Sequence, residues 1–167
     1  MAQIGLRCLS NMSLPRTFVG FSSDDIHYYR LMQAWKSNEH IDFNFTDCQL
    51  PDVINSDSET YVKSKCRERI NMAGKFIQLI GDGTKFKRKY VPWEAEVAIE
   101  KGCTIIGVNL NGSRKSDDLC PSWIHDIGAI FVPFNAAIIK YALENYSMNK
   151  NDDYHYKPEV YAQLGIR

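Results

Sequence analysis

Two short apolar runs lie in the middle of the chain. The segment between them contains residues that are typical of the start and the end of a helix. Residues 76–81 and 103–110 are rich in Ile, Leu and Val and are too short for ordinary helices, which is typical of strands. Between them, Pro92 suits the first turn of a helix and Gly102 suits the position just past its end. Nearly continuous apolar strands are covered on both faces, so the stretch predicts a parallel strand, helix, strand unit.

Strand and helix patterns alternate along the rest of the chain. Strands are expected at 17–21, 41–45, 76–81, 103–110 and 128–134, and helices at 25–37, 58–74, 92–102 and 136–146. Segment 41–45 alternates apolar and polar residues, as an edge strand with one exposed face does. Five strands alternating with helices predict a doubly wound α/β fold with a parallel sheet.

The pattern fits one domain over residues 16–147. Residues 1–15 have weak periodicity and are expected to form a flexible N-terminal arm, in which Met12 is a second candidate start. Residues 148–167 are expected to be a C-terminal extension that packs on the domain or trails from it.

Composition excludes several classes of protein. The formal net charge of zero argues against a nucleic-acid binder, which needs a basic surplus to meet phosphates. No apolar run is long enough to span a bilayer, and the first residues lack the apolar centre of a secretory signal. Five scattered cysteines indicate a reduced, cytoplasmic protein with free thiols, and no paired ligand spacing points to a metal site.

Candidate functional residues follow the predicted strands. In a sheet of order 2-1-3-4-5, a crevice opens between the first and third strands, where loops 21–25 and 81–89 meet. Glu94 is the better inward-facing acid of the central helix because Val97 and Ala98 are its surface neighbours, whereas Glu96 lies beside Glu100. Glu94 and the basic run 85–89 can also be explained without a function. An acidic side chain is favoured in the first turn of a helix, and a run of basic side chains is by default solvated.

The order and spacing of several short motifs resemble a TIR domain, and more closely the bacterial and archaeal TIR-like branch that includes the TIR protein of the Thoeris antiphage system. The motifs are residues 17–22 with Asp24 and Asp25, a strand ending in Asp47, residues 77–81 with Thr84, residues 90–94 followed by Ala98, and residues 102–108. The resemblance covers residues 16–146. It implies a flavodoxin-like three-layer α/β sandwich with a five-stranded parallel sheet of order 2-1-3-4-5.

The resemblance also implies cleavage of NAD+ at the nicotinamide–ribose bond, with no further cofactor and no metal. The family's catalytic glutamate is Glu94, four residues after the aromatic Tyr90, with Glu96 as the fallback in another register. The loop after the second strand, 47–57, governs access and self-association in the family. Together with the strand ends, the resemblance names these substrate-binding residues: Phe21, Ser22, Asp24, Asp47, Gly81, Thr84, Tyr90, Trp93 and Asn109.

Nicotinamide leaves this bond without needing a general acid, so the chemistry asks for one ionised carboxylate that stabilises an oxocarbenium-like ribose. A first-turn position helps Glu94 to stay ionised. The resemblance implies a cyclic or conjugated ADP-ribose signal in antiphage defence and a separate effector protein that reads the product. Because free consumption of NAD+ would harm the host, we also expect a trigger or a need for assembly, for example as a homo-oligomer. Two alternatives stay open: a non-catalytic TIR-like module for self-association or partner binding, and another flavodoxin-like nucleoside enzyme such as a deoxyribosyl transferase.

Overall fold

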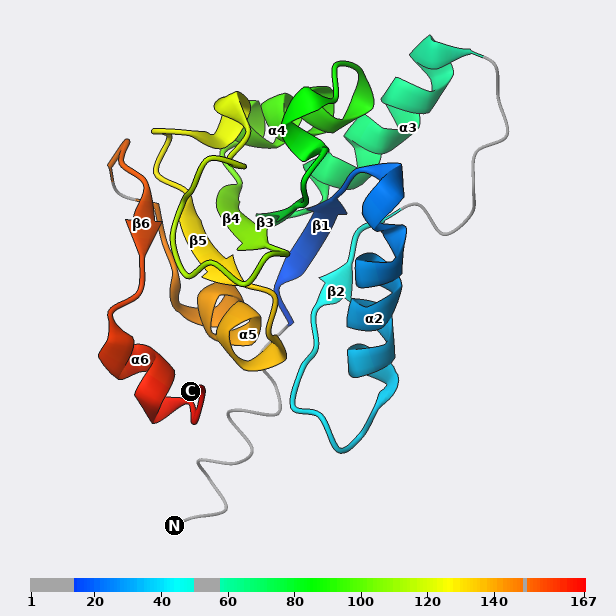
Figure 1. The fold of residues 1–167 in the computed structure, drawn as a ribbon. Coiled ribbons are helices and arrows are strands. Elements are labelled where there is room, and N and C mark those ends of the chain that lie inside the picture. Colours follow the sequence, from blue (N-terminus) through cyan, green and yellow to red (C-terminus); the bar gives the residue numbers. More distant parts are fainter. Residues whose placement is uncertain (1–13, 50–57, 149) are drawn as a thin grey trace.

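A parallel sheet of six strands forms the centre of the computed structural model, which describes residues 14–49, 58–148 and 150–167 (Figure 1). The strands lie in the order β2-β1-β3-β4-β5-β6, and every neighbouring pair is parallel. Their bounds are β1 Arg16–Gly20, β2 Thr46–Asp47, β3 Lys75–Ile80, β4 Thr104–Asn109, β5 Ile130–Pro133 and β6 Tyr154–His155. The predicted order 2-1-3-4-5 is confirmed, and the predicted number of five strands is wrong because β6 extends the sheet.

Helices cover both faces of the sheet and make three layers (Figure 1). On one face lie α2 (Ile26–Ser37), α5 (Ala136–Asn145) and α6 (Pro158–Gln163), which share a core with Val19, Ile77 and Val108. On the other face lie α3 (Glu59–Asn71) and α4 (Tyr90–Lys101), which pack over Phe76 and Ile105. Successive strand residues alternate between the two cores, so strands covered on both faces read as continuous apolar runs.

Helix α4 carries the acid singled out by the sequence pattern. Gly102 ends the helix in the left-handed conformation, with φ 89°, and its N–H donates to the Ala98 and Ile99 carbonyls. The helix begins at Tyr90, two residues before Pro92, so Glu94 is its fifth residue and lies beyond the first turn. Residues Ala95, Val97 and Ala98 are buried, whereas Glu96 and Glu100 are exposed, as the helical periodicity predicts.

The predicted edge strand at 41–45 is wrong, because the strand is the two residues that follow. Phe43 and Phe45 are buried, so the alternation is real, but their N–H groups donate to the Ile41 carbonyl and the Asn44 side chain. Pairing with β1 begins only at Thr46, whose N–H donates to the Pro15 carbonyl at 3.0 Å. Alternate residues of segment 41–45 are therefore buried although this segment does not pair with β1.

The C-terminal residues complete the sheet edge and the core. Tyr154 and His155 pair with Ile130 and Phe131, and the Tyr154 N–H donates to the Ala129 carbonyl at 2.9 Å. In α6, the Tyr161 side chain is 1% exposed and packs in the core shared with α5. The predicted arm lies outside the described residues up to position 13, and among the described helices none combines the length and apolarity that a bilayer crossing requires.

Candidate functional site

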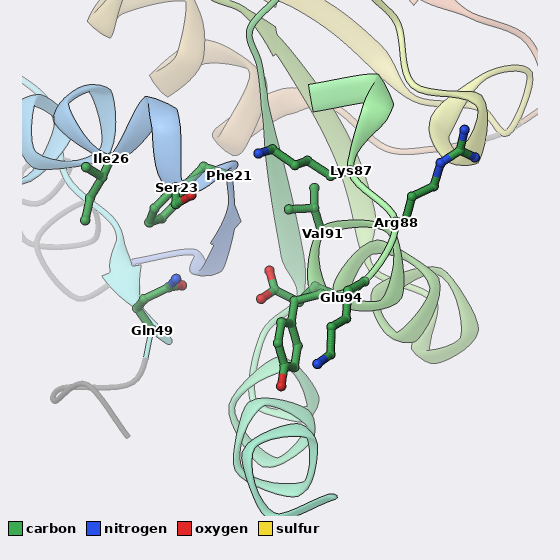
Figure 2. A pocket seen from close by; sticks show the side chains of 10 residues that line it. Phe21, Ser23, Ile26, Gln49, Lys87, Arg88, Val91 and Glu94 are labelled. Atoms are coloured by element: carbon green, nitrogen blue, oxygen red, sulfur yellow. The ribbon is translucent and has the colours of Figure 1, made fainter. Parts of the chain in front are cut away.

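A pocket of about 420 Å³ opens beyond the carboxyl ends of β1 and β3, where the sequence pattern predicts a crevice. Its walls come from three parts of the chain: the turn after β1 with the start of α2, the segment that follows β2, and the basic segment that leads into α4. The side chains that line it are Phe21, Ser23, Ile26, Gln49, Lys87, Arg88, Lys89, Tyr90, Val91 and Glu94 (Figure 2).

The carboxyl group of Glu94 points into the pocket toward the side where Phe21 and Gln49 lie (Figure 2). The side chain is partly buried, because it stands on the same surface of α4 as the buried Val97 and Ala98. Within the described part of the chain its carboxylate has neither a hydrogen-bond nor an ion-pair partner. An acid without a partner at the base of a pocket is a feature expected of a functional group and not of a structural one.

Burial raises the pKa of Glu94 from 4.5 to about 8. The buried thiol of Cys66 on α3 interacts with this carboxylate, since burial first and then the Glu94 charge raise the pKa of Cys66 to about 11. The expectation that a first-turn position keeps Glu94 ionised is wrong. Because α4 begins at Tyr90, the unpaired N–H groups of the helix start lie a turn away, and their field falls off within that turn.

Two basic residues at the rim, Lys87 and Lys89, form ion pairs at the surface, and Arg88 and Lys89 are exposed, which agrees with the default interpretation of the run 85–89 as solvated. The Lys87 ammonium lies 3.2 Å from the Asp24 carboxylate, and this hydrogen bond is the main reason that the pKa of Asp24 is lowered. Lys89 lies 3.3 Å from the Glu59 carboxylate. In Figure 2, Lys87 extends over the pocket toward Ser23, whereas the Arg88 side chain points away.

Gln49 reaches the pocket from the end of β2, and its backbone is held on both sides. Its N–H donates to the Asp47 carboxylate at 2.9 Å, and its carbonyl accepts from the Arg69 guanidinium at 2.9 Å. The side-chain oxygen Oε1 is buried and has no hydrogen-bond partner among the residues that the structure describes. Figure 2 places the Gln49 amide across the pocket from the Glu94 carboxyl group. A fixed backbone that carries an unpaired amide suits a residue that binds a ligand.

Among the predicted site residues, Phe21, Tyr90 and Glu94 line this pocket together, and the others do not. Ser22 is 1% exposed and caps the turn after β1 by accepting from the Asp24 N–H. Asp24 is engaged with Lys87, as described above. Asp47 accepts the hydroxyl of Tyr29 as well as the Gln49 N–H, so it positions Gln49 and does not itself face the pocket. The remainder of the predicted access loop, residues 50–57, lies outside the described residues.

Of the remaining four predicted residues, Gly81, Thr84 and Asn109 shape neighbouring loops and Trp93 packs between helices. Gly81 donates its N–H to the Thr84 hydroxyl at 2.9 Å, so this N–H is not free to bind a phosphate. Asn109 donates to the Ser113 and Lys115 carbonyls, each at 3.0 Å, and so folds the loop after β4. Trp93 faces α3, where the Lys63 ammonium lies 5.3 Å from its ring centroid.

Sequence reasoning missed the pocket residues that depend on tertiary contacts. Ile26 and Val91 line the pocket from the first turns of α2 and α4, and Gln49 has no local sequence signal. Lys87 and Lys89 were visible as a basic run, but their acidic partners lie more than 25 residues away in the chain. Only the spatial closeness of β1, β2 and β3 could identify this set.

One further group could hold a metal ion by geometry alone. His125 lies between Asp126, 3.2 Å from Nε2, and Asp153, 2.6 Å from Nδ1. Both ring nitrogens are engaged by carboxylates, and the group sits near the surface away from the pocket. The contacts account for it as an ion-pair cluster that ties the η3 region (Ser122–Ile124) to the segment before β6.

Comparisons with known proteins connect the pocket to a family. The family model for the TIR-like domain of the Thoeris protein ThsB matches residues 18–115, which include every residue that lines the pocket. No curated protein matches the chain. Among solved structures, a conserved protein from Enterococcus faecalis V583 is similar, with 16% sequence identity and a TM-score of 0.42, over 91% of this chain and 86% of that chain.

Proposed function

The chain belongs to the TIR-like domain family of the Thoeris protein ThsB, and from this premise we propose that it cleaves NAD+ at the bond between nicotinamide and ribose. One observation carries the proposal: a carboxyl group without a partner, Glu94, points into a pocket that also offers aromatic rings, an amide and cations.

Glu94 is the catalytic residue of this proposal. At pH 7 burial keeps its carboxyl group largely protonated in the unliganded protein. The nicotinamide ring of NAD+ is cationic, and a positive charge a few ångströms away favours the carboxylate. Substrate binding therefore lowers the pKa of Glu94 and creates the anion that stabilises the oxocarbenium-like ribose. Ionisation that accompanies binding would confine the reactive carboxylate to the complex.

The other pocket residues match the remaining parts of the substrate. Phe21 and Tyr90 supply ring faces for the flat, cationic nicotinamide. Lys87 and Lys89 supply positive charge for the diphosphate, which would replace Asp24 and Glu59 as their partners. Binding would then exchange existing ion pairs for phosphate contacts, so the cations are already near their places before the substrate arrives.

We further propose that the product is a cyclic or conjugated ADP-ribose that acts as a signal in antiphage defence, read by a separate effector protein. The ribosyl cation reacts with whichever nucleophile the pocket holds, and a pocket that favours the substrate's own adenine or a second bound nucleophile over water yields such a product. Self-association of the chain is part of this proposal, because control by assembly would limit wasteful loss of NAD+.

The test is to follow nicotinamide release and adenine-containing products by chromatography and mass spectrometry, at low and high protein concentration. Glu94→Gln should reduce release by about 100-fold or more, the scale of losing one main electrostatic stabiliser. Glu96→Gln is the matched control, since this exposed glutamate lies two residues away on the same helix. Equal loss in both variants, or loss only in Glu96→Gln, would refute the role of Glu94.

One observation favours a second candidate, a non-catalytic TIR-like module. The raised pKa leaves Glu94 mostly uncharged at pH 7, and no described side chain forms an ion pair that would ionise it. This candidate predicts self-association or partner binding with NAD+ left intact at every protein concentration. Turnover of a nucleoside without consumption of NAD+ would instead indicate a nucleoside glycosyl transferase.

A further inference from the structure

A second pocket, of about 270 Å³, lies between the loop after β4 and the C-terminal segment. Arg114 and Lys115 line it from the loop, and His155, Tyr156 and Tyr161 line it from β6 to α6. It shares no residue with the pocket that contains Glu94. The first pocket lies beyond β1 and β3 in the interior of the sheet order, and the second lies beside the edge strand β6.

The lining of this second pocket is mainly apolar, carries the hydrogen-bond donors of Arg114 and Lys115, and has no carboxylate side chain. Lys115 and His155 have no side-chain partner within the described ranges. The Arg114 guanidinium is held in place, because it lies 4.1 Å from the ring centroid of Tyr161 and donates to the Arg167 carbonyl at 2.7 Å. In a chain whose formal charges sum to zero, Arg114 and Lys115 without an acidic side chain in the lining form a local excess of positive charge.

Two buried hydroxyl groups point to the same conclusion. Tyr156 and Tyr161 each have a buried phenol oxygen with no hydrogen-bond partner, and the described residues contain only one other side-chain atom of this kind, Gln49 Oε1 in the first pocket. Burial raises the pKa of both phenols, so both stay protonated and act as donors. A buried polar group without a protein partner calls for an explanation, and a bound ion, water or ligand oxygen would supply one.

We propose that this second pocket binds a small phosphate-bearing molecule of about the size of a nucleoside monophosphate. A phosphate accepts hydrogen bonds through all of its exposed oxygens and so matches the donors that Arg114 and Lys115 bring to the pocket. Arg114 supplies a preorganised guanidinium, and Lys115 and His155 supply N–H groups at the rim. Tyr156 and Pro158 supply apolar surface for a flat ring attached to the phosphate. The volume is near the lower end of small-molecule sites, roughly 300 Å³.

Such a ligand would bridge the loop after β4 and the C-terminal segment. These two parts are joined at present by the contact of Arg114 with Tyr161 and Arg167. A bound phosphate would add a link between Lys115 and His155 and so stabilise the docking of residues 154–167 on the domain, because a ligand that binds only the folded state raises stability by mass action.

The test titrates the full chain with AMP, inorganic phosphate and adenosine while recording amide NMR spectra, which separate the two pockets. Binding of AMP and phosphate should shift the amides of residues 113–115 and 154–161, and adenosine should bind at least tenfold more weakly. Lys115→Glu should weaken AMP binding at these amides by tenfold or more. Lys157→Glu is the matched control, because this exposed lysine lies next to the pocket without lining it, and it should change the affinity by less than twofold.

Several outcomes would overturn the proposal. These are the absence of shifts at residues 113–115 and 154–161, an equal effect of Lys115→Glu and Lys157→Glu, and adenosine binding as tightly as AMP. Tyr156→Phe gives an independent check, because it removes the unpaired hydroxyl and keeps the ring. It should weaken AMP binding severalfold without lowering the Tm, whereas a lower Tm with unchanged AMP affinity would assign the hydroxyl a structural role instead.

Discussion

Replacing Glu94 by Gln should make the protein more stable at neutral pH while removing the proposed activity. The substitution nearly keeps the size and shape of the side chain and replaces the ionisable carboxyl group with a neutral amide. The native state holds that proton much more tightly than the unfolded chain, because burial raises the pKa of Glu94 from 4.5 to about 8. Ionisation of Glu94 therefore destabilises the native protein.

The sign and size of the effect follow from linkage. Since the folded pKa is the higher one, stability is greatest below pH 4.5, falls as the pH rises through 4.5 to about 8, and is constant above that. At ~1.36 kcal/mol per pKa unit, the cost is below ~1 kcal/mol at pH 5, ~3 kcal/mol at pH 7 and ~5 kcal/mol at pH 9. These are upper bounds, because the side chain keeps partial contact with solvent. Glu94→Gln should recover these amounts.

The assay is urea unfolding of the wild type and Glu94→Gln at pH 5, 7 and 9, with thermal melts alongside. A gain of ~3 kcal/mol corresponds to roughly 6–12 °C in Tm for a chain of this size. Glu96→Gln serves as the control, since its exposed carboxylate should give no comparable pH-dependent difference.

Two results would refute this reasoning about Glu94. The first is a Glu94→Gln variant that is no more stable than the wild type at pH 7. The second is a stability difference that is the same at pH 5 and pH 9, because a pH-independent gain cannot come from a titrating carboxyl group. Either result would mean that the carboxyl group is ionised at little cost in the native protein.

Four further predictions concern the pocket and the core. With NAD+ as substrate, kcat/KM should rise about tenfold per pH unit up to about pH 8 and then level off, while the inflection in kcat lies lower because the cationic substrate favours ionised Glu94. Lys87→Ala should raise KM for NAD+ by about tenfold, the scale of one lost charge-assisted hydrogen bond, and leave phosphate-free nicotinamide riboside unaffected. Gln49→Ala should raise KM severalfold with an unchanged Tm, because its Oε1 makes no hydrogen bond in the folded protein. Gly107→Ala should lower stability by about 1–3 kcal/mol in urea unfolding, since an added Cβ would lie 2.6 Å from Phe131 Cδ1 in the core.

Each of these four has a clear contrary result. A kcat/KM that does not change between pH 6 and 8 would mean that the reaction rate does not depend on ionisation of Glu94. An equal rise in KM for NAD+ and for nicotinamide riboside would mean that Lys87 does not act by binding phosphate. A lower Tm in Gln49→Ala would make its amide structural. Gly107→Ala should regain stability when Phe131 is shortened to Leu, and no regain would mean that the steric contact is not the cause.

The parallel sheet and its crevice were predictable because their signals are local. The Ile- and Val-rich runs around residues 76–81 and 103–110 gave β3 and β4, and Pro92 and Gly102 marked α4 to within two residues at each end. Strand order then located the pocket between β1 and β3, since parallel strands present their carboxyl ends to one edge of the sheet. The inward face of Glu94 followed from the 3.6-residue period of the helix.

The short elements β2, β6 and α6 were not predictable, because two or six residues are too few to show a periodic pattern of apolar and polar residues. The segment 41–45 has the alternation of a strand, but a side chain and a turn take its N–H groups, so pairing with β1 starts at Thr46. The sixth strand and α6 depend on contacts with β5 and α5, which form only when the C-terminal residues reach the sheet.

Residue identity and periodicity by themselves determined that Glu94 sits on the inner face of a helix beside a crevice. Tertiary structure decided what that position does to it. The pKa depends on how deeply the surrounding chain buries the carboxyl group and on the distance to the helix start at Tyr90. The partners of Lys87 and Lys89 and the place of Gln49 likewise depend on segments that are distant in sequence. Electrostatic energies follow distances and solvent exposure, and both are set only when the chain is folded.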